Sequence, residues 1–198
     1  ATAAFIDEIR PLVAANTFLP DPGKGVSAAA LAPLRDVDPR AALRFDEVEG
    51  SWLTDHLTAV GAAAAASAAA DDLAGRKVAI EGFGTAGPAL ARQVVEWGGI
   101  ITAISTAAGT ATRAEGFHLG SIIDTWKTSG ADMVARLGEA DPAWKVFGSP
   151  VDVLFTGSKM GALSHAGAEH VQASVVVPTA SIPVTTKAFA MLRRNGTR

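Results

Sequence analysis

The amino-acid sequence predicts an α/β fold in which a doubly wound parallel sheet carries helices on both of its faces. The first observation is a set of short apolar runs that are typical of strands buried on both sides. The second is that segments with helical spacing separate these runs, and this alternation favours a parallel sheet. The third is composition, since 48% of the residues are apolar and 19% are charged, as in a globular domain. The runs are residues 78–80, 100–104, 151–155 and 174–177.

Charge and composition exclude several classes of protein. The net charge is −3 and no basic block is present, so no nucleic-acid partner is expected. Cysteine is absent, which excludes disulfides and thiolate metal sites and favours a cytoplasmic location. The four histidines lack metal-ligand spacing, so no metal is expected. The longest weakly polar run, residues 60–70, is mostly alanine and too short to span a bilayer, so no membrane partner is expected.

The chain is long enough for one main core with a short additional segment. We expect an N-terminal segment of helices and loops, 1–50, that packs on a main domain, 51–198. Apolar residues on one face predict a helix over 3–15, with a kink or an early end at Pro11. The other elements expected before residue 50 are a loop over 18–25, a helix over 28–34 capped by Ser27, a polar turn over 36–40 and a short strand over 43–48.

In the main domain, Ser51 is predicted to cap an alanine-rich helix that ends near Ala70. The glycine pair Gly98-Gly99 closes the helix that follows the first strand. Residues 107–116 are polar and turn-rich, and we expect no regular structure there. The remaining predicted helices are 119–128, 131–137, 164–171 and a last one that begins after Thr185 or Thr186 and ends at Arg194.

A glycine-rich loop lies between the first predicted strand and its helix. Gly82-Phe83-Gly84-Thr85-Ala86-Gly87 has the spacing G-x-G-x-x-G within a strand–helix–strand unit of about 30 residues, the context of the dinucleotide-binding fingerprint. Gly82 permits the tight turn, Gly84 lets a pyrophosphate approach the backbone, and Gly87 lets the helix pack closely. The helix start would direct free N–H groups at the phosphates. The pattern favours a Rossmann-like nucleotide site; the alternative is a loop kept only for structure.

Ligands of an open parallel sheet bind outside the carboxyl ends of its strands. This rule gathers the glycine loop with three clusters of small or hydroxyl-bearing residues: Ser105-Thr106, Thr156-Gly157-Ser158 and Thr179-Ala180-Ser181. Thr106 stands where NAD-specific sites usually have an acidic residue for the ribose 2′-hydroxyl, so NAD and NADP are both plausible cofactors. Glu81, directly before Gly82, is either a buried acid near the phosphates or a solvated residue that points away.

Four motifs in this order and spacing resemble the glutamate/leucine/phenylalanine/valine dehydrogenase family, over about residues 21–196. Residues 73–84, LAGRKVAIEGFG, resemble the family's L-x-G-K-x-V-A-x-Q-G-F-G. Gly109 with residues 114–117, AEGF, is similar to its G-x-x-x-x-P-E-G-I/L. Residues 151–155, VDVLF, resemble C-D-I-L-I before a P-A-A sequence, and residues 180–185, ASIPVT, stand where the family has A-N-G-P-T-T.

The resemblance implies an oxidoreductase that binds NAD or NADP and oxidatively deaminates an L-amino acid to a 2-oxo acid. It implies that Thr54 lies near the nicotinamide. Gly157 and Ser158 replace two alanines at the nicotinamide ribose, and Ser181 replaces the asparagine of A-N-G-P-T-T. Asp21 resembles the aspartate of a D-x-G-x-G segment that takes part in proton transfer, and a simple turn aspartate is the alternative.

In the family, a preceding substrate domain supplies a catalytic lysine, and we find no room for such a domain before Asp21. We therefore expect either a piece of a longer chain or a reduced homologue. The first hypothesis is that the chain is the cofactor-binding domain of an amino-acid dehydrogenase. Its partners would then be an amino-acid substrate and, in a homo-oligomer, further copies of the same chain. The second is a non-catalytic homologue that serves as a nucleotide-binding regulatory or structural partner.

Overall fold

The computed structural model describes residues 2–20 and 26–198, so the candidate Asp21 lies outside the described residues. The chain divides into two compact units, Ala1–Asp55 and His56–Arg198. Each unit is built around its own buried apolar residues. No helix among the described residues combines the length and apolarity needed to cross a membrane.

The first unit contains two helices that pack through one apolar core. Helix α1 (Thr2–Ala14) runs past Pro11, so the expected early end is not found. Helix α2 (Ala28–Arg35) begins as predicted, because the Ser27 hydroxyl accepts a hydrogen bond from the Ala30 N–H at 3.2 Å. The residues that form this core are Ile6, Ile9, Val13, Leu31, Leu34, Ala41 and Ala42.

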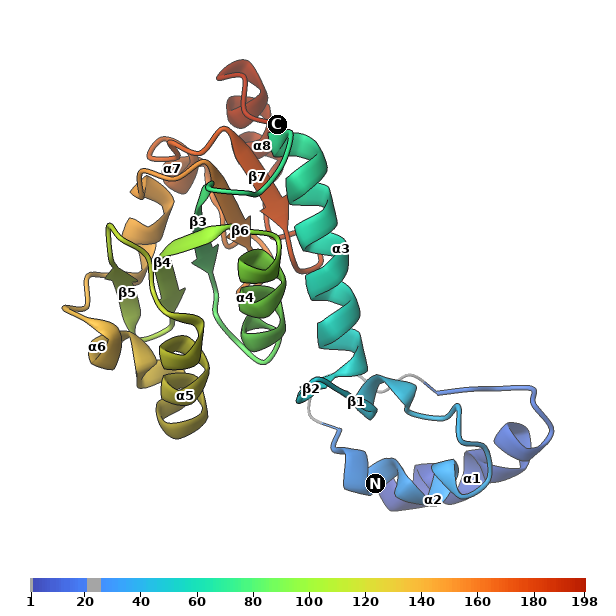
Figure 1. The fold of residues 1–198 in the computed structure, drawn as a ribbon. Helices are drawn as coiled ribbons and strands as arrows, with labels where there is room; N and C mark the ends of the chain where they lie inside the picture. Colours follow the sequence, from blue (N-terminus) through green and yellow to red (C-terminus); the bar gives the residue numbers. More distant parts are fainter. Residues whose placement is uncertain (1, 21–25) are drawn as a thin grey trace. The chain divides into compact units, whose positions relative to one another are not determined.

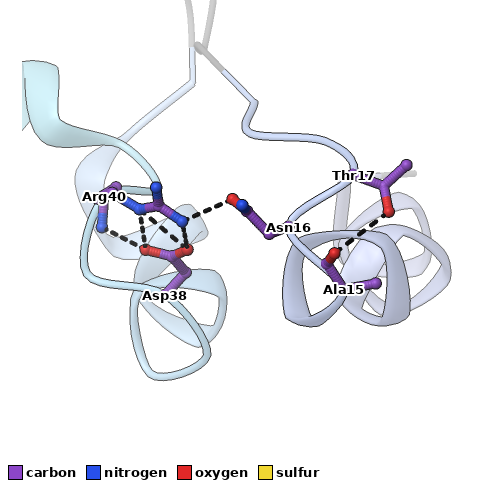
Figure 2. Close-up of polar contacts among 5 residues, drawn as sticks. All are labelled: Ala15, Asn16, Thr17, Asp38 and Arg40. Carbon is purple, nitrogen blue, oxygen red and sulfur yellow. Dashed lines mark hydrogen bonds and ion pairs between the residues drawn. The ribbon is translucent and has the colours of Figure 1, made fainter.

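A polar contact joins the end of α1 to the turn after α2. Figure 2 shows the Arg40 guanidinium between Asp38 and Asn16. It donates to the Asp38 carboxylate at 2.7–3.2 Å and to the Asn16 side-chain oxygen at 2.6 Å. The hydrogen bond from the Arg40 side chain lowers the pKa of Asp38 below its ordinary value.

The structure near residue 50 differs from the prediction. The predicted strand over 43–48 is a 3₁₀ turn, η1 (Leu43–Phe45), followed by the two-residue strand β1 (Glu47–Val48). Ser51 lies in β2 (Ser51–Trp52), which pairs with β1 in an antiparallel hairpin. Helix α3 (Leu53–Ala70) begins one residue later than a cap at Ser51 predicts, and it ends at Ala70 as expected.

The second unit is a five-stranded sheet in the order β5-β4-β3-β6-β7 (Figure 1). The strands β3, β4, β6 and β7 are parallel, as predicted, and β5 pairs antiparallel with β4 at one edge. The chain passes from β3 to β4 on one side and later returns to β6 on the other side of β3. The strand order therefore reverses between β3 and β6, which is where ligands of such sheets bind. The strands are β3 (Lys77–Glu81), β4 (Ile100–Thr106), β5 (Gly109–Thr112), β6 (Val153–Thr156) and β7 (Val175–Pro178).

Helices cover both faces of the sheet, which confirms the doubly wound architecture. Val78 and Ile80 pack on one face with α3, α4 and α5, while Ala79 between them packs on the other face with η3, α7 and α8. The alanines of α3 let that helix approach the sheet closely. The elements of this unit besides α3 and the strands are α4 (Gly87–Glu96), α5 (Leu119–Ser129), η2 (Gly130–Asp132), α6 (Met133–Leu137), η3 (Ala143–Gly148), α7 (His165–Ala168) and α8 (Thr186–Arg194).

Strand β5 lies inside the segment 107–116, for which no regular structure was expected. Its four residues, GTAT, carry no large apolar side chain, so the segment lacks the signal of a strand. Pairing with β4 creates the strand: Ala103 lies opposite Thr112, and Thr106 lies opposite Gly109. The edge position explains the sequence, because an edge strand needs fewer apolar residues than a central one.

Candidate functional site

The glycine loop joins β3 to α4 at the point where the strand order reverses. Gly82 has φ +81°, a value that L-residues with side chains rarely adopt. A Cβ atom at Gly82 would also lie 2.5 Å from the backbone N and Cα of Ser158, in the loop after β6. At Gly84, by contrast, the nearest atom to an added Cβ would be the Gly82 carbonyl oxygen at 3.8 Å. Gly82 is therefore required by the fold, whereas the space beside Gly84 is open.

The side chain of Phe83 turns away from this open space and into the core. Phe83 is 3% exposed, and its ring packs edge-on against Trp126 with 5.6 Å between the ring centroids. A Cβ atom at Gly87 would lie 2.5–2.7 Å from the Phe83 ring. Gly87 thus makes room for the Phe83 ring.

Backbone N–H groups of the loop are available for a ligand. Within residues 2–20 and 26–198, the N–H groups of Gly84, Thr85 and Ala86 have no hydrogen-bond acceptor. Ala86, the N-cap of α4, provides no side-chain cap, and the helix dipole adds a partial positive charge there. A loop with free N–H groups and open space beside Gly84 is suited to the phosphates of a dinucleotide.

The end of β4 holds the glycine loop in place. The Gly82 N–H donates to the Ser105 hydroxyl at 3.3 Å, and the Phe83 N–H donates to the Ser105 carbonyl at 2.7 Å. Thr106 is 6% exposed, and its hydroxyl donates to the Ala131 carbonyl at 2.5 Å. Ser105 and Thr106 therefore lie at the predicted edge of the sheet, where their hydroxyls already form hydrogen bonds with the protein.

Glu81 is a buried acid that links β3 to the loop after β6. It is 8% exposed, and its Oε2 atom accepts three hydrogen bonds. The Thr156 hydroxyl donates to it at 2.8 Å, the Gly157 N–H at 2.9 Å and the Ser158 N–H at 3.3 Å. Of the two alternatives for Glu81, the structure shows the buried one. Its signal in the sequence was a charged residue at the end of an apolar strand.

The loop after β6 contacts the loop after β7. A Cβ atom at Gly157 would collide with the Thr179 hydroxyl oxygen and lie 3.1 Å from the Thr179 carbonyl carbon. Glycine thus replaces the family's alanine at the position where threonine crowds it. Ser158 and Ser181 are exposed. Ile182 has φ +52°, an unfavourable conformation for a β-branched residue, at the position where the family motif has glycine.

The structure brings together most of the residues that the sequence predicted as a site. The glycine loop, Ser105, Gly157 and Ser158 are joined by the contacts described above, at the carboxyl edge of β3, β4 and β6. Thr54 belongs to the first unit, in the first turn of α3. Among the described residues, no group of three or more His, Asp and Glu side chains could hold a metal ion.

The sheet and its glycine loop define a doubly wound α/β domain of the kind that binds dinucleotides. A sequence model of the glutamate/leucine/phenylalanine/valine dehydrogenase family matches residues 50–198, which is most of the chain. The chain belongs to this family. Among curated proteins it is 31% identical over 152 residues to an NAD-specific glutamate dehydrogenase of Staphylococcus aureus, and 26% identical over 143 residues to a glutamate dehydrogenase of Aeropyrum pernix. These alignments cover 74% and 72% of the chain but only 36% and 34% of the relatives.

Solved structures confirm the fold over almost the whole chain. A hetero-hexameric glutamate dehydrogenase of Thermus thermophilus matches 99% of this chain and 49% of its own, with a TM-score of 0.81 and 24% identity. An L-tryptophan dehydrogenase of Nostoc punctiforme matches 99% of this chain and 53% of its own, with a TM-score of 0.61 and 18% identity. The chain thus spans about half the length of these solved relatives.

Proposed function

We propose that this chain is the cofactor-binding part of an NAD(P)-dependent oxidoreductase that deaminates an L-amino acid to a 2-oxo acid. In this reaction the Cα hydride passes to the nicotinamide, and water replaces the imino nitrogen, which leaves as ammonia. The observation that carries the proposal is the bare glycine loop at the reversal of strand order, with the free N–H groups of Gly84, Thr85 and Ala86. Family membership supports the same assignment.

Each part of the loop has a separate role in the proposed site. The three N–H groups and the start of α4 would hold the pyrophosphate. Ser105 would act through the loop, since it accepts the Gly82 N–H. Gly157, Ser158 and Ser181 would line the nicotinamide end, and Thr106 would lie near the adenosine ribose. A bound nicotinamide cofactor supplies the hydride acceptor; the chain's own residues bind and orient it.

A cofactor titration of a loop variant tests this proposal. Gly84→Val adds a side chain where the structure leaves open space, so we expect circular dichroism and thermal unfolding close to those of the parent chain. The new side chain would occupy the approach of the pyrophosphate, and affinity for NADH and NADPH, measured by nucleotide fluorescence, should fall by at least about tenfold. Gly120→Val is the matched control, because Gly120 lies in α5 with nothing within 4 Å of an added Cβ. Unchanged affinity in Gly84→Val would place the phosphates elsewhere.

Both nicotinamide cofactors belong in this titration. The Staphylococcus aureus relative is named as NAD-specific. In this chain the neutral Thr106 neither repels a 2′-phosphate nor provides a carboxylate for a 2′-hydroxyl, so the proposal includes NAD and NADP. Formation of NADH or NADPH from a panel of L-amino acids, measured on the complete natural protein, tests the chemistry.

A non-catalytic nucleotide-binding homologue is the second candidate. It is favoured by the buried carboxyl group of Glu81 beside the proposed site and by the strained Ile182 in place of the family's glycine. Cofactor binding without turnover in the complete protein would support it. For both candidate functions we propose that the protein forms a homo-oligomer, which light scattering tests. We also propose a cytoplasmic location, which cell fractionation tests.

A further inference from the structure

A second cavity lies toward the amino ends of β3 and β4, whereas the glycine loop follows the carboxyl end of β3. Its volume is about 300 Å³, in the lower range of small-molecule sites. It is lined by the start of β3, the middle of β4, the end of β5 with the two residues after it, and residues between 141 and 150 in and around η3. All of these belong to the second unit, so the cavity is a feature of one compact body.

The charged side chains around this cavity carry an excess of positive charge. Lys77, Arg113 and Lys145 line it together with one acid, Asp141. The Lys145 ammonium lies 2.6 Å from Asp141, so this pair is neutral. Across the described part of the chain, neither Lys77 nor Arg113 has a carboxylate partner for its side chain. Two positive charges are therefore left without compensation.

The exposed Arg113 side chain contacts two neighbours beside the cavity. Its guanidinium donates to the Leu137 carbonyl at 3.3 Å and lies 5.2 Å from the centre of the Phe117 ring. The planar guanidinium keeps further N–H groups for an anion.

Two hydroxyl groups at the cavity form no hydrogen bond with the residues that the structure describes. Ser149 is 5% exposed, and its hydroxyl oxygen is fully buried without a hydrogen bond, which is unusual because buried polar groups are nearly always paired. The Thr102 hydroxyl also lacks a partner in the described part of the chain, but its oxygen is accessible to solvent. The Thr102 hydroxyl is therefore free to bind a ligand in the cavity.

A bulge in β4 places Thr102 at this cavity. Val78 of β3 pairs with Ile101, but the next residue, Ala79, pairs with Ala103, so Thr102 is an extra residue in β4. Bulges re-aim a side chain that regular pairing would direct elsewhere, and they are frequent beside binding sites. A strand without a bulge would pair each of its residues with the neighbouring strand in regular register.

We propose that this cavity is a binding site for a small dianion, such as a phosphate monoester or a dicarboxylate. Lys77 and Arg113 neutralise its two negative charges, and Thr102 donates a hydrogen bond from its hydroxyl. The site is separate from the glycine loop and does not depend on the proposed dehydrogenase activity.

Titrations followed by ¹H–¹⁵N NMR of the 198-residue chain test this site. Inorganic phosphate is one probe and succinate the other, each added in exchange for chloride at constant ionic strength. We expect saturable shifts of the Thr102, Arg113 and Ser149 amides, with a dissociation constant on the order of 1 mM. Phosphate bound at the glycine loop would instead shift Gly84 and its neighbours, and Gly84→Val should remove only those shifts. The stronger of the two probes identifies the class of ligand.

Charge variants distinguish a defined site from general attraction of anions. Arg113→Gln and Lys77→Met should each weaken binding about tenfold, whereas Lys127→Met, on the exposed end of α5, should leave it unchanged. Thr102→Val keeps the shape but removes the hydroxyl, and it should weaken binding several-fold without lowering thermal stability. Absence of saturable shifts at the cavity for both probes overturns the proposal. Equal loss in Lys127→Met and Arg113→Gln does so as well, because it indicates net charge alone.

Discussion

The three hydrogen bonds on the Glu81 carboxylate give the sharpest stability prediction. Glu81→Ala would leave the fully buried Thr156 hydroxyl and the Gly157 N–H without an acceptor. Hydrogen bonds to a charged group contribute about 1.5–3 kcal/mol each, and the third contact, at 3.3 Å, is too long to add much. We therefore expect Glu81→Ala to lower the free energy of unfolding by about 3–6 kcal/mol.

Glu81→Gln is the informative comparison, because its side-chain oxygen can take the place of Oε2. It keeps the acceptor and the shape while removing the charge, so we expect a loss of no more than about 1.5 kcal/mol. Urea denaturation followed by tryptophan fluorescence measures both variants. Glu139→Ala, an exposed residue for which the described structure shows no hydrogen bond, is the control.

The difference in the free energy of unfolding between the two variants tests whether the Glu81 carboxylate acts as a hydrogen-bond acceptor. If Glu81→Ala and Glu81→Gln destabilise equally, the carboxylate does not act as an acceptor for the loop after β6. If Glu81→Ala costs less than about 1 kcal/mol, the donors find water, and the burial argument fails. Cofactor affinity gives a second reading, because release of Gly157 and Ser158 should weaken NADH binding in Glu81→Ala more than in Glu81→Gln.

Three other features lead to further predictions. Gly157→Ala should destabilise the chain by about 1–3 kcal/mol in urea denaturation, and adding Thr179→Ala should recover part of the loss; independent effects would contradict the contact. Ile182→Gly should stabilise by about 1 kcal/mol, because it relieves a positive φ at an exposed residue, whereas a loss of stability would show that the side chain is needed. The lowered pKa of Asp38 means that its contact with Arg40 stabilises the first unit above the ordinary carboxyl pKa and is lost as the pH falls through the lowered value. An NMR titration of the Asp38 carboxyl should therefore give a pKa below the ordinary aspartate value of 3.8, and Arg40→Ala should return the pKa to that value.

Elements with strong local signals could be predicted from the sequence. The apolar runs of β3, β4 and β6 favour burial inside a sheet, the apolar run of β7 also forms a strand, although at an edge, and Thr185 caps α8 as expected. The glycine spacing placed the loop between β3 and α4 correctly. Strand β5 and the hairpin β1–β2 could not be predicted, because residues distant in sequence or across a turn provide the pairing partners that create them.

The candidate site divides in the same way. Its location follows from the order of strands and loops, which the sequence encodes directly. The interactions that fix its shape do not: the Glu81 carboxylate meets donors 75–77 residues away, and Gly82 is confined by Ser158. The position of Thr102 beside the proposed dianion site likewise depends on a one-residue shift between two strands.

The sequence by itself determined the α/β class, the strand–loop–helix unit and the family, since periodicity and glycine spacing are local properties of the chain. Only the tertiary structure decided which groups are free to bind a ligand. A hydrogen-bond donor is free or occupied according to what packs beside it, and in this protein those neighbours come from other strands.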